Sequence, residues 1–72
     1  MHVARLEIEF EQEDDGRWIA EIPALPGVMC YGTSQEEARC KVEALAFRVF
    51  ADRLENGEPI PEVVKEAFLV AA

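Results

Sequence analysis

The chain has 72 residues, of which 50% are apolar and 31% are charged, a balance typical of a folded globular protein rather than a disordered one. Its 15 acidic and 7 basic side chains give a formal net charge of -8, so its surface repels nucleic acid and attracts basic partners. So short a chain forms one domain, residues 1–72, and buries only about 60% of the surface that its unfolded state exposes, so we expect self-association.

Cysteine and histidine residues offer no metal site. Cys30 and Cys40 have no Cys or His at the spacing of metal ligands, and the one histidine, His2, stands at the terminus. We therefore predict no cofactor, and we interpret both cysteines as small apolar residues of a core or an interface. With no cleavable signal and no apolar run near the ~20 residues of a membrane span, we expect a cytoplasmic protein without membrane association.

Residues 5–11, RLEIEFE, alternate between apolar and charged side chains, which predicts a half-buried strand. Asp15-Gly16 then predicts a hairpin with a primed turn, since such turns need residues that tolerate positive φ. The returning strand is residues 17–22, RWIAEI. The faces predicted to be buried carry Leu6, Ile8, Phe10, Trp18, Ala20 and Ile22, and the opposite faces carry Arg5, Glu7, Glu9, Glu11, Ile19 and Glu21.

The stretch EIPALPGVMCYG, residues 21–32, connects two predicted strands through a stiff elbow. Pro23 cannot donate a hydrogen bond to a sheet, so it ends the second strand or restricts it to an edge. Pro26-Gly27 predicts a type II turn, whose central positions need a fixed φ followed by a positive one. The chain is thereby redirected into a third strand over residues 28–32.

A long helix is predicted over residues 35–56. Ser34 and Glu37 form the capping-box pattern at its start, in which each side chain accepts from the other residue's backbone N–H, and Gly57 is a typical residue just past a helix end. The helix would be roughly 33 Å long, enough to cover the sheet. Its apolar stripe assigned to the sheet is Ala38, Val42, Leu45, Ala46, Val49 and Phe50.

The same helix carries apolar residues on its other side, which one sheet cannot cover. We expect this side to be covered by a second copy of the chain, although the last segment of the same chain could also fold over it. The polar arc consists of Lys41, Arg48, Asp52 and Glu55. The residues assigned to self-association are Cys40, Ala44, Phe47, Ala51 and Leu54.

The tail after Gly57 fits both helix and strand patterns. We predict a short helix over residues 61–66 and a fourth strand over residues 67–71. The expected fold is therefore α+β, an antiparallel three- to four-stranded sheet packed on one long helix, in the order β-β-β-α-β.

Several of these features fall together on the pattern xxAExPxLPGxxxxGxTxEEA, and the chain thereby resembles the HicB-like antitoxin family. The resemblance covers about residues 3–70 and includes the prolines that follow the long helix. The matching positions are Ala20, Glu21, Pro23, Leu25, Pro26, Gly27, Gly32, Ser34, Glu36, Glu37 and Ala38, with Pro59 and Pro61 in the later loop.

The resemblance implies a stand-alone HicB-like domain with a partial RNase H-like fold that forms a homodimer or homotetramer. It also implies a partner, because many such antitoxins neutralise HicA, a small basic toxin that cleaves RNA. The family's DNA-binding C-terminal segment has no counterpart before Ala72, so we expect no operator binding and no direct contact with nucleic acid.

An enzyme is not expected. RNase H activity needs carboxylates that converge on two metal ions, whereas Glu7, Glu9 and Glu11 project in parallel from one strand face. No other residues suggest acid–base or nucleophilic catalysis, so we predict no catalytic residue.

A binding surface is the better hypothesis for the sheet's outer face. An acidic field around a few apolar anchors suits a basic protein partner, although an ordinary solvated sheet face fits equally well. The residues beside the acidic strand are either Met29 and Tyr31 or Val28 and Cys30, and we choose the first pair. The candidate partner-binding residues are Glu7, Glu9, Ile19, Glu21, Met29 and Tyr31. The alternative function is a solitary oligomeric scaffold or small-ligand module without a toxin partner.

Overall fold

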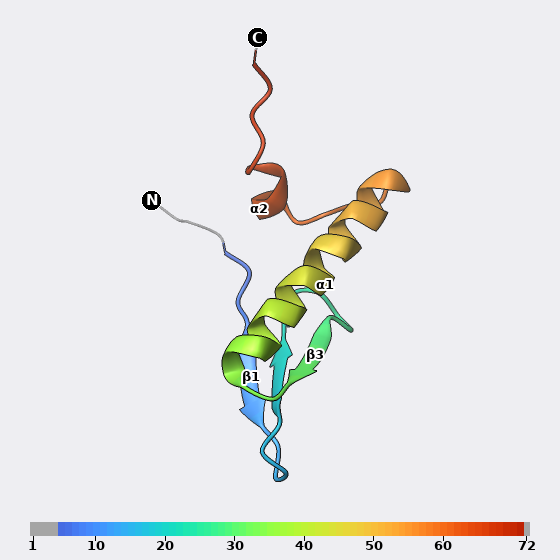
Figure 1. Cartoon of the computed structure of the whole chain (residues 1–72). Helices are drawn as coiled ribbons and strands as arrows, with labels where there is room; N and C mark the ends of the chain where they lie inside the picture. Colours follow the sequence, from blue (N-terminus) through green and yellow to red (C-terminus); the bar gives the residue numbers. More distant parts are fainter. Residues whose placement is uncertain (1–4, 72) are drawn as a thin grey trace.

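The computed structural model describes residues 5–71, so His2 lies outside the described residues. A three-stranded antiparallel sheet, in the order β1-β2-β3, packs one face against a long helix (Figure 1). This confirms the predicted α+β class. The elements are β1 (Glu9–Gln12), β2 (Trp18–Glu21), β3 (Met29–Gly32), α1 (Gln35–Glu55) and the short α2 (Glu62–Lys65).

The turn between β1 and β2 differs from the predicted primed turn. The N–H of Gly16 donates to the carbonyl of Glu13 at 2.9 Å, and the N–H of Glu13 donates to the carbonyl of Arg17 at 2.7 Å. Only Gly16 has a positive φ in this loop, at 92°, whereas a type I′ turn needs one at both central residues. The hairpin is thus closed by a three-residue loop with glycine at its left-handed position. A loop of this kind is compatible with the right-handed twist of the two strands that it joins.

The first strand is shorter than predicted, since residues 5–8 are not part of the sheet. In the β1–β2 register Glu9 pairs with Glu21, so Glu7 would fall opposite Pro23. Pro23 has no N–H to donate, and the chain turns away there, with the N–H of Leu25 bonded to the carbonyl of Ile22 at 2.9 Å. The ladder therefore stops at Glu9, while the apolar side chains before it still pack on the core.

The elbow between β2 and β3 contains the predicted type II turn. The N–H of Val28 donates to the carbonyl of Leu25 at 3.0 Å, and Gly27 has φ 87°. The N–H of Ile22 donates to the carbonyl of Val28 at 3.1 Å, which closes the loop at its base. These bonds satisfy the backbone of the elbow and fix the direction of β3.

The helix α1 begins and ends close to the predicted residues. The Ser34 hydroxyl accepts from the N–H of Glu37 at 3.1 Å, as predicted, but the Glu37 carboxylate accepts from the N–H of Thr33 at 2.9 Å rather than from that of Ser34. At the other end the N–H groups of Gly57 and Glu58 donate to the carbonyls of Leu54 and Arg53, the pair of bonds of a Schellman motif.

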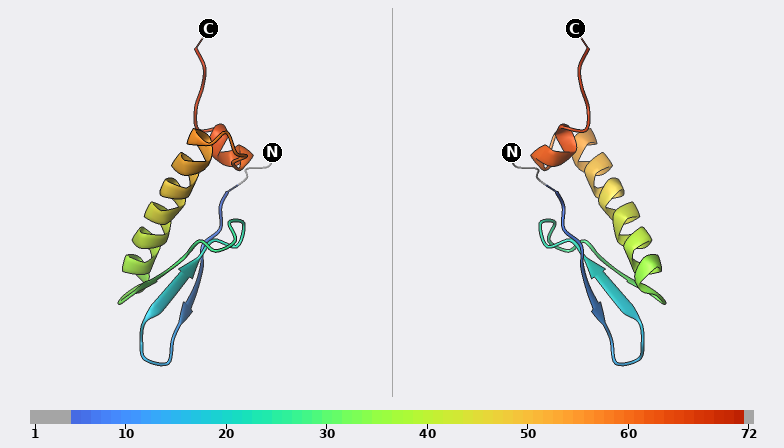
Figure 2. Two further views of the ribbon diagram at one scale, coloured as in Figure 1. Left: turned by 90° about the vertical axis from the view of Figure 1, so that its right-hand side faces the viewer. Right: turned by 90° about the vertical axis from the view of Figure 1, so that its left-hand side faces the viewer.

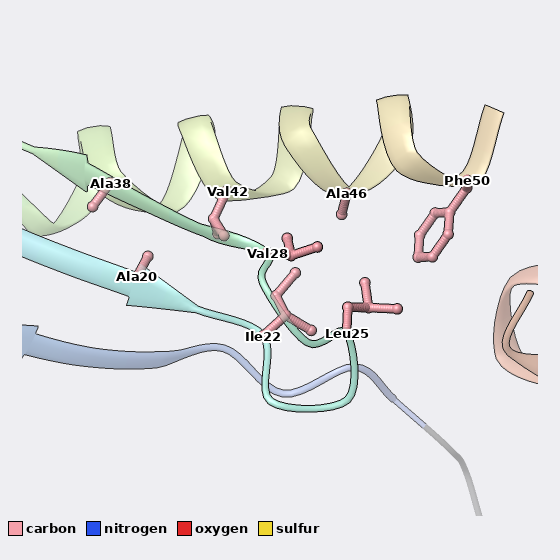
Figure 3. Close-up of a cluster of buried hydrophobic side chains, with 8 residues drawn as sticks. All are labelled: Ala20, Ile22, Leu25, Val28, Ala38, Val42, Ala46 and Phe50. Atoms are coloured by element: carbon pink, nitrogen blue, oxygen red, sulfur yellow. The ribbon is translucent and has the colours of Figure 1, made fainter. Parts of the chain in front are cut away.

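The core lies between the sheet and α1 and includes the elbow. Figure 3 shows Ile22 and Leu25 pointing from the elbow toward α1, where Ala46 and Phe50 face them. Leu25 is 1% exposed and Val42 is fully buried. The predicted stripe of α1 is confirmed as the face that packs on the sheet. The buried core residues are Ala20, Ile22, Leu25, Val28, Ala38, Val42, Ala46 and Phe50.

The predicted fourth strand is wrong. The short α2 forms within the predicted range, but residues 68–71 form neither helix nor strand. Figures 1 and 2 show this tail running past the end of α1 and away from the sheet, so no strand edge lies beside it. Phe68, Leu69 and Val70 are accordingly 78%, 95% and 93% exposed.

Candidate protein-binding surfaces

The outer face of the sheet consists of two rows of side chains that run across the strands. In the first row Glu9, Glu21 and Met29 lie side by side, and in the second Glu11, Ile19 and Tyr31 do so. Because alternate residues of a strand point to opposite faces, both rows point away from α1. Each row is acidic at the β1 edge and apolar at the β3 edge.

The structure decides between the two pairs left open in β3. Val28 is buried and Cys30 is partly buried against the core, whereas Met29 and Tyr31 are 45% and 41% exposed. Met29 and Tyr31 therefore belong to the outer face, as chosen from the sequence. Ile19 lies half-buried between Glu11 and Tyr31 in the second row.

Glu7 is exposed but precedes β1, so it is not fixed by the sheet ladder as Glu9 and Glu21 are. Glu11, which the sequence placed on the same strand face, shares a row with Ile19 and belongs with the surface. We call Glu9, Glu11, Ile19, Glu21, Met29 and Tyr31 the sheet surface.

Arg17 is a basic residue at this surface that the candidate set did not include. Its guanidinium carbon lies 4.8 Å from the centre of the Tyr31 ring, a cation–π contact. Its Nε also donates to the Asp15 carboxylate at 2.8 Å. The backbone N–H of Arg17 bonded to the same carboxylate lowers the pKa of Asp15. Arg17 thus contacts the exposed Tyr31 ring, which the residue spacing alone did not indicate.

The outer side of α1 forms a second apolar surface. Phe47 is 71% exposed and Leu54 is 56% exposed. The rings of Phe47 and Phe50 pack edge to face, with their centroids 6.5 Å apart. Figure 2 shows no segment of residues 5–71 running over this side of the helix. We call the exposed residues Cys40, Ala44, Phe47, Ala51 and Leu54 the helix surface.

An apolar groove of ≈ 180 Å³ lies between the segment before β1 and α1. Most small-molecule sites are pockets of about 300–1,000 Å³ that enclose the ligand. The groove is too small for a typical ligand of that kind. Its lining residues are Leu6, Ile8, Ile22, Glu43, Ala46, Phe47 and Phe50.

Within residues 5–71, no three His, Cys, Asp or Glu side chains are grouped so that they could hold a metal ion. Glu7, Glu9 and Glu11 are all exposed and occupy alternate positions of one extended segment. They do not form such a group. No described helix is long and apolar enough to cross a membrane.

Comparison of the chain with models of protein families, with curated proteins and with solved structures found no match.

Proposed function

We propose that this protein is an antitoxin-like binding module of a type II toxin–antitoxin system, and that it binds and neutralises a small basic RNA-cleaving toxin of the HicA type. It acts by covering the toxin and not as an enzyme. The observation that supports the proposal is the sheet surface, where acidic side chains adjoin exposed apolar ones on a rigid sheet. The resemblance of the elbow and the helix start to HicB-like antitoxins points the same way.

The physical chemistry of the sheet surface suits such a partner. Three exposed or half-buried residues, Ile19, Met29 and Tyr31, provide apolar contact area, and the glutamates of β1 and β2 provide negative potential. Charges around an interface speed the encounter with an oppositely charged partner, while apolar and aromatic anchors supply most of the affinity. The net charge of -8 adds a long-range attraction for a basic protein.

The proposal predicts that a small basic HicA-like protein is encoded beside the gene of this chain, and the test uses that protein. The two proteins are co-expressed, growth is recorded, and the affinity of the purified pair is measured by titration calorimetry. The double variant Glu9→Lys and Glu21→Lys should weaken binding about tenfold or more and abolish the rescue of growth. Its matched control, Glu58→Lys with Glu66→Lys, changes the net charge equally but lies away from the sheet surface.

Tyr31→Ala tests the apolar part of the same surface and should also weaken binding, because aromatic anchors are common hot spots. If the neighbouring toxin is not bound, or is bound equally by the sheet-surface variant and its control, the proposed function is wrong.

The helix surface favours a second candidate function, a self-associating module whose homodimer or homotetramer is the working unit. Two large apolar side chains, Phe47 and Leu54, are exposed in the single chain, and a chain of this size gains stability by covering them. A stable oligomer that binds no HicA-like toxin would favour this candidate over the first.

A further inference from the structure

The residues of the helix surface follow a heptad repeat. Cys40, Ala44, Phe47, Ala51 and Leu54 are separated by four, three, four and three residues, the spacing of the apolar seam of a coiled coil. All five are exposed, and they form a stripe beside the one that carries the buried Ala38, Val42, Ala46 and Phe50, with Phe47 next to Phe50. Such a seam is suited to another helix rather than to a sheet or a small ligand.

We propose that two copies of the chain pair through this seam with their α1 helices antiparallel, and that Phe47 of each copy packs against Ala51 of the other. This inference deepens the proposal of self-association and does not depend on binding of a toxin.

The alternation of side-chain size favours the antiparallel direction. In a parallel pair each residue meets its own copy, so Phe47 would meet Phe47 and Ala51 would meet Ala51, which gives a crowded layer followed by an empty one. In an antiparallel pair, the two-fold axis can cross α1 at the level of residue 49 along the helix. Phe47 then meets Ala51 of the second copy, and Leu54 meets Ala44. These layers then each contain one large and one small side chain, which allows close packing of the helices.

Charges beside the seam select the same register. With the axis near Val49, Lys41 lies opposite Glu55 of the second copy, and this pair occurs twice. A shift by one heptad, which would place Phe47 against Ala44, brings Lys41 opposite Arg48 instead and is repulsive. Lys41 Nζ lies 3.4 Å from Glu37 within the chain, whereas in the described residues Glu55 takes part in no ion pair.

One contact in this register is unfavourable, since Arg48 faces its own copy at the two-fold axis. Asp52 lies one helical turn from Arg48 on the same polar arc, and both are exposed, so solvent and this carboxylate reduce the repulsion.

The charge pair provides the main test, made by sedimentation equilibrium of the full chain at low salt. The wild type should dimerise, and Lys41→Glu should weaken the dimer about tenfold, because it creates two repulsive pairs with Glu55. The double variant Lys41→Glu with Glu55→Lys should restore wild-type affinity. Circular dichroism checks that each variant is folded. A monomeric wild type, or a double variant as weak as the single one, would overturn the proposal.

The direction of the helices is tested with the native Cys40. In a parallel pair the two Cys40 residues would meet and oxidise to a disulfide. In the antiparallel pair Cys40 faces residue 58 of the second copy, so the two thiols lie about 27 Å apart along the helices. A Cys30→Ser variant treated with a mild oxidant should therefore remain free of disulfide-linked dimer, and rapid cross-linking through Cys40 would overturn the antiparallel arrangement.

Discussion

Gly32 is the position where the structure predicts the sharpest effect of adding a single methyl group. It is the buried last residue of β3, and a Cβ there would overlap the backbone N of Ala38 and lie 2.9 Å from the Cα of Ala38. Since both atoms belong to helix backbone, no side-chain rotation relieves the overlap. Gly32 does not have a positive φ, so the position requires space and not a special backbone conformation.

Gly32→Ala should therefore push the first turn of α1 away from the sheet. Overpacking costs about 1–3 kcal/mol, and contact with backbone places this case at the upper end. Alanine also reduces the entropy of the unfolded chain, which offsets about 0.4–1 kcal/mol. The net loss is about 2 kcal/mol, out of the roughly 4–11 kcal/mol that a domain of this size has in total.

Urea denaturation followed by Trp18 fluorescence and circular dichroism measures this loss. The urea concentration at the midpoint should fall by about 1–2 M, given how steeply the unfolding free energy of small proteins depends on urea. The protein concentration is kept fixed, so that the degree of association does not change between samples. Gly27 is the matched control, because its φ is 87° and no atom lies within 4 Å of its Cβ position. Asparagine should be tolerated better than alanine at Gly27, but not at Gly32. A Gly32→Ala variant within about 0.5 kcal/mol of wild type would refute the steric argument.

Three further predictions concern the core, the helix start and the tail. Leu25→Ala should cost about 2–5 kcal/mol in urea denaturation, because Leu25 is 1% exposed, while Leu69→Ala, at a 95% exposed position, should change little. The Thr33 N–H bonded to the carboxylate lowers the pKa of Glu37, so its ionised form stabilises the fold. This contribution is complete above the ordinary pKa of 4.5 and is lost as the pH falls through the lowered folded-state pKa. Glu37→Gln should lower the melting temperature at pH 7 and reduce its decline below pH 4.5, and parallel curves for variant and wild type would contradict this. Removal of residues 68–72 should leave the free energy of unfolding within about 0.5 kcal/mol of wild type, and a larger loss would show that the tail packs on the domain.

Much of the fold could be predicted from local patterns, because the physical causes are local. The Pro26-Gly27 pair specifies its turn through the φ values that the two residues accept, and the bond from Val28 to Leu25 confirms it. The long helix follows from apolar periodicity and from the Ser34 cap, and it begins at Gln35 as predicted.

The errors arose where the outcome depends on partners distant in sequence. Alternation in residues 5–8 is typical of a strand, but a strand also needs a neighbour, and Pro23 leaves none there. The apolar tail has the composition of a strand, yet α2 directs it away from both sheet edges. At the helix start Glu37 could accept from either of two adjacent N–H groups, and only the three-dimensional structure shows that it accepts from Thr33.

The sheet surface was largely predictable, because strand alternation determines which side chains share a face. Register was not, and it is register that places Glu21 between Glu9 and Met29. The contact of Arg17 with Tyr31 was missed because these residues are adjacent only across two paired strands.

The two surfaces lie on different sides of the molecule, since one is the outer face of the sheet and the other is an exposed side of the helix that covers the inner face. In the proposed dimer, the two α1 helices therefore lie at the centre, and each copy carries its sheet surface on the outside. If the proposed function is right, such a dimer would leave both sheet surfaces free for two toxin molecules, in a 2:2 complex. Phe47→Glu should then break the dimer and leave toxin affinity unchanged, whereas Tyr31→Ala should weaken toxin binding and leave the dimer intact. Sedimentation and calorimetry on both variants measure the two effects separately. Loss of both activities in either folded variant would show that the two surfaces do not act independently.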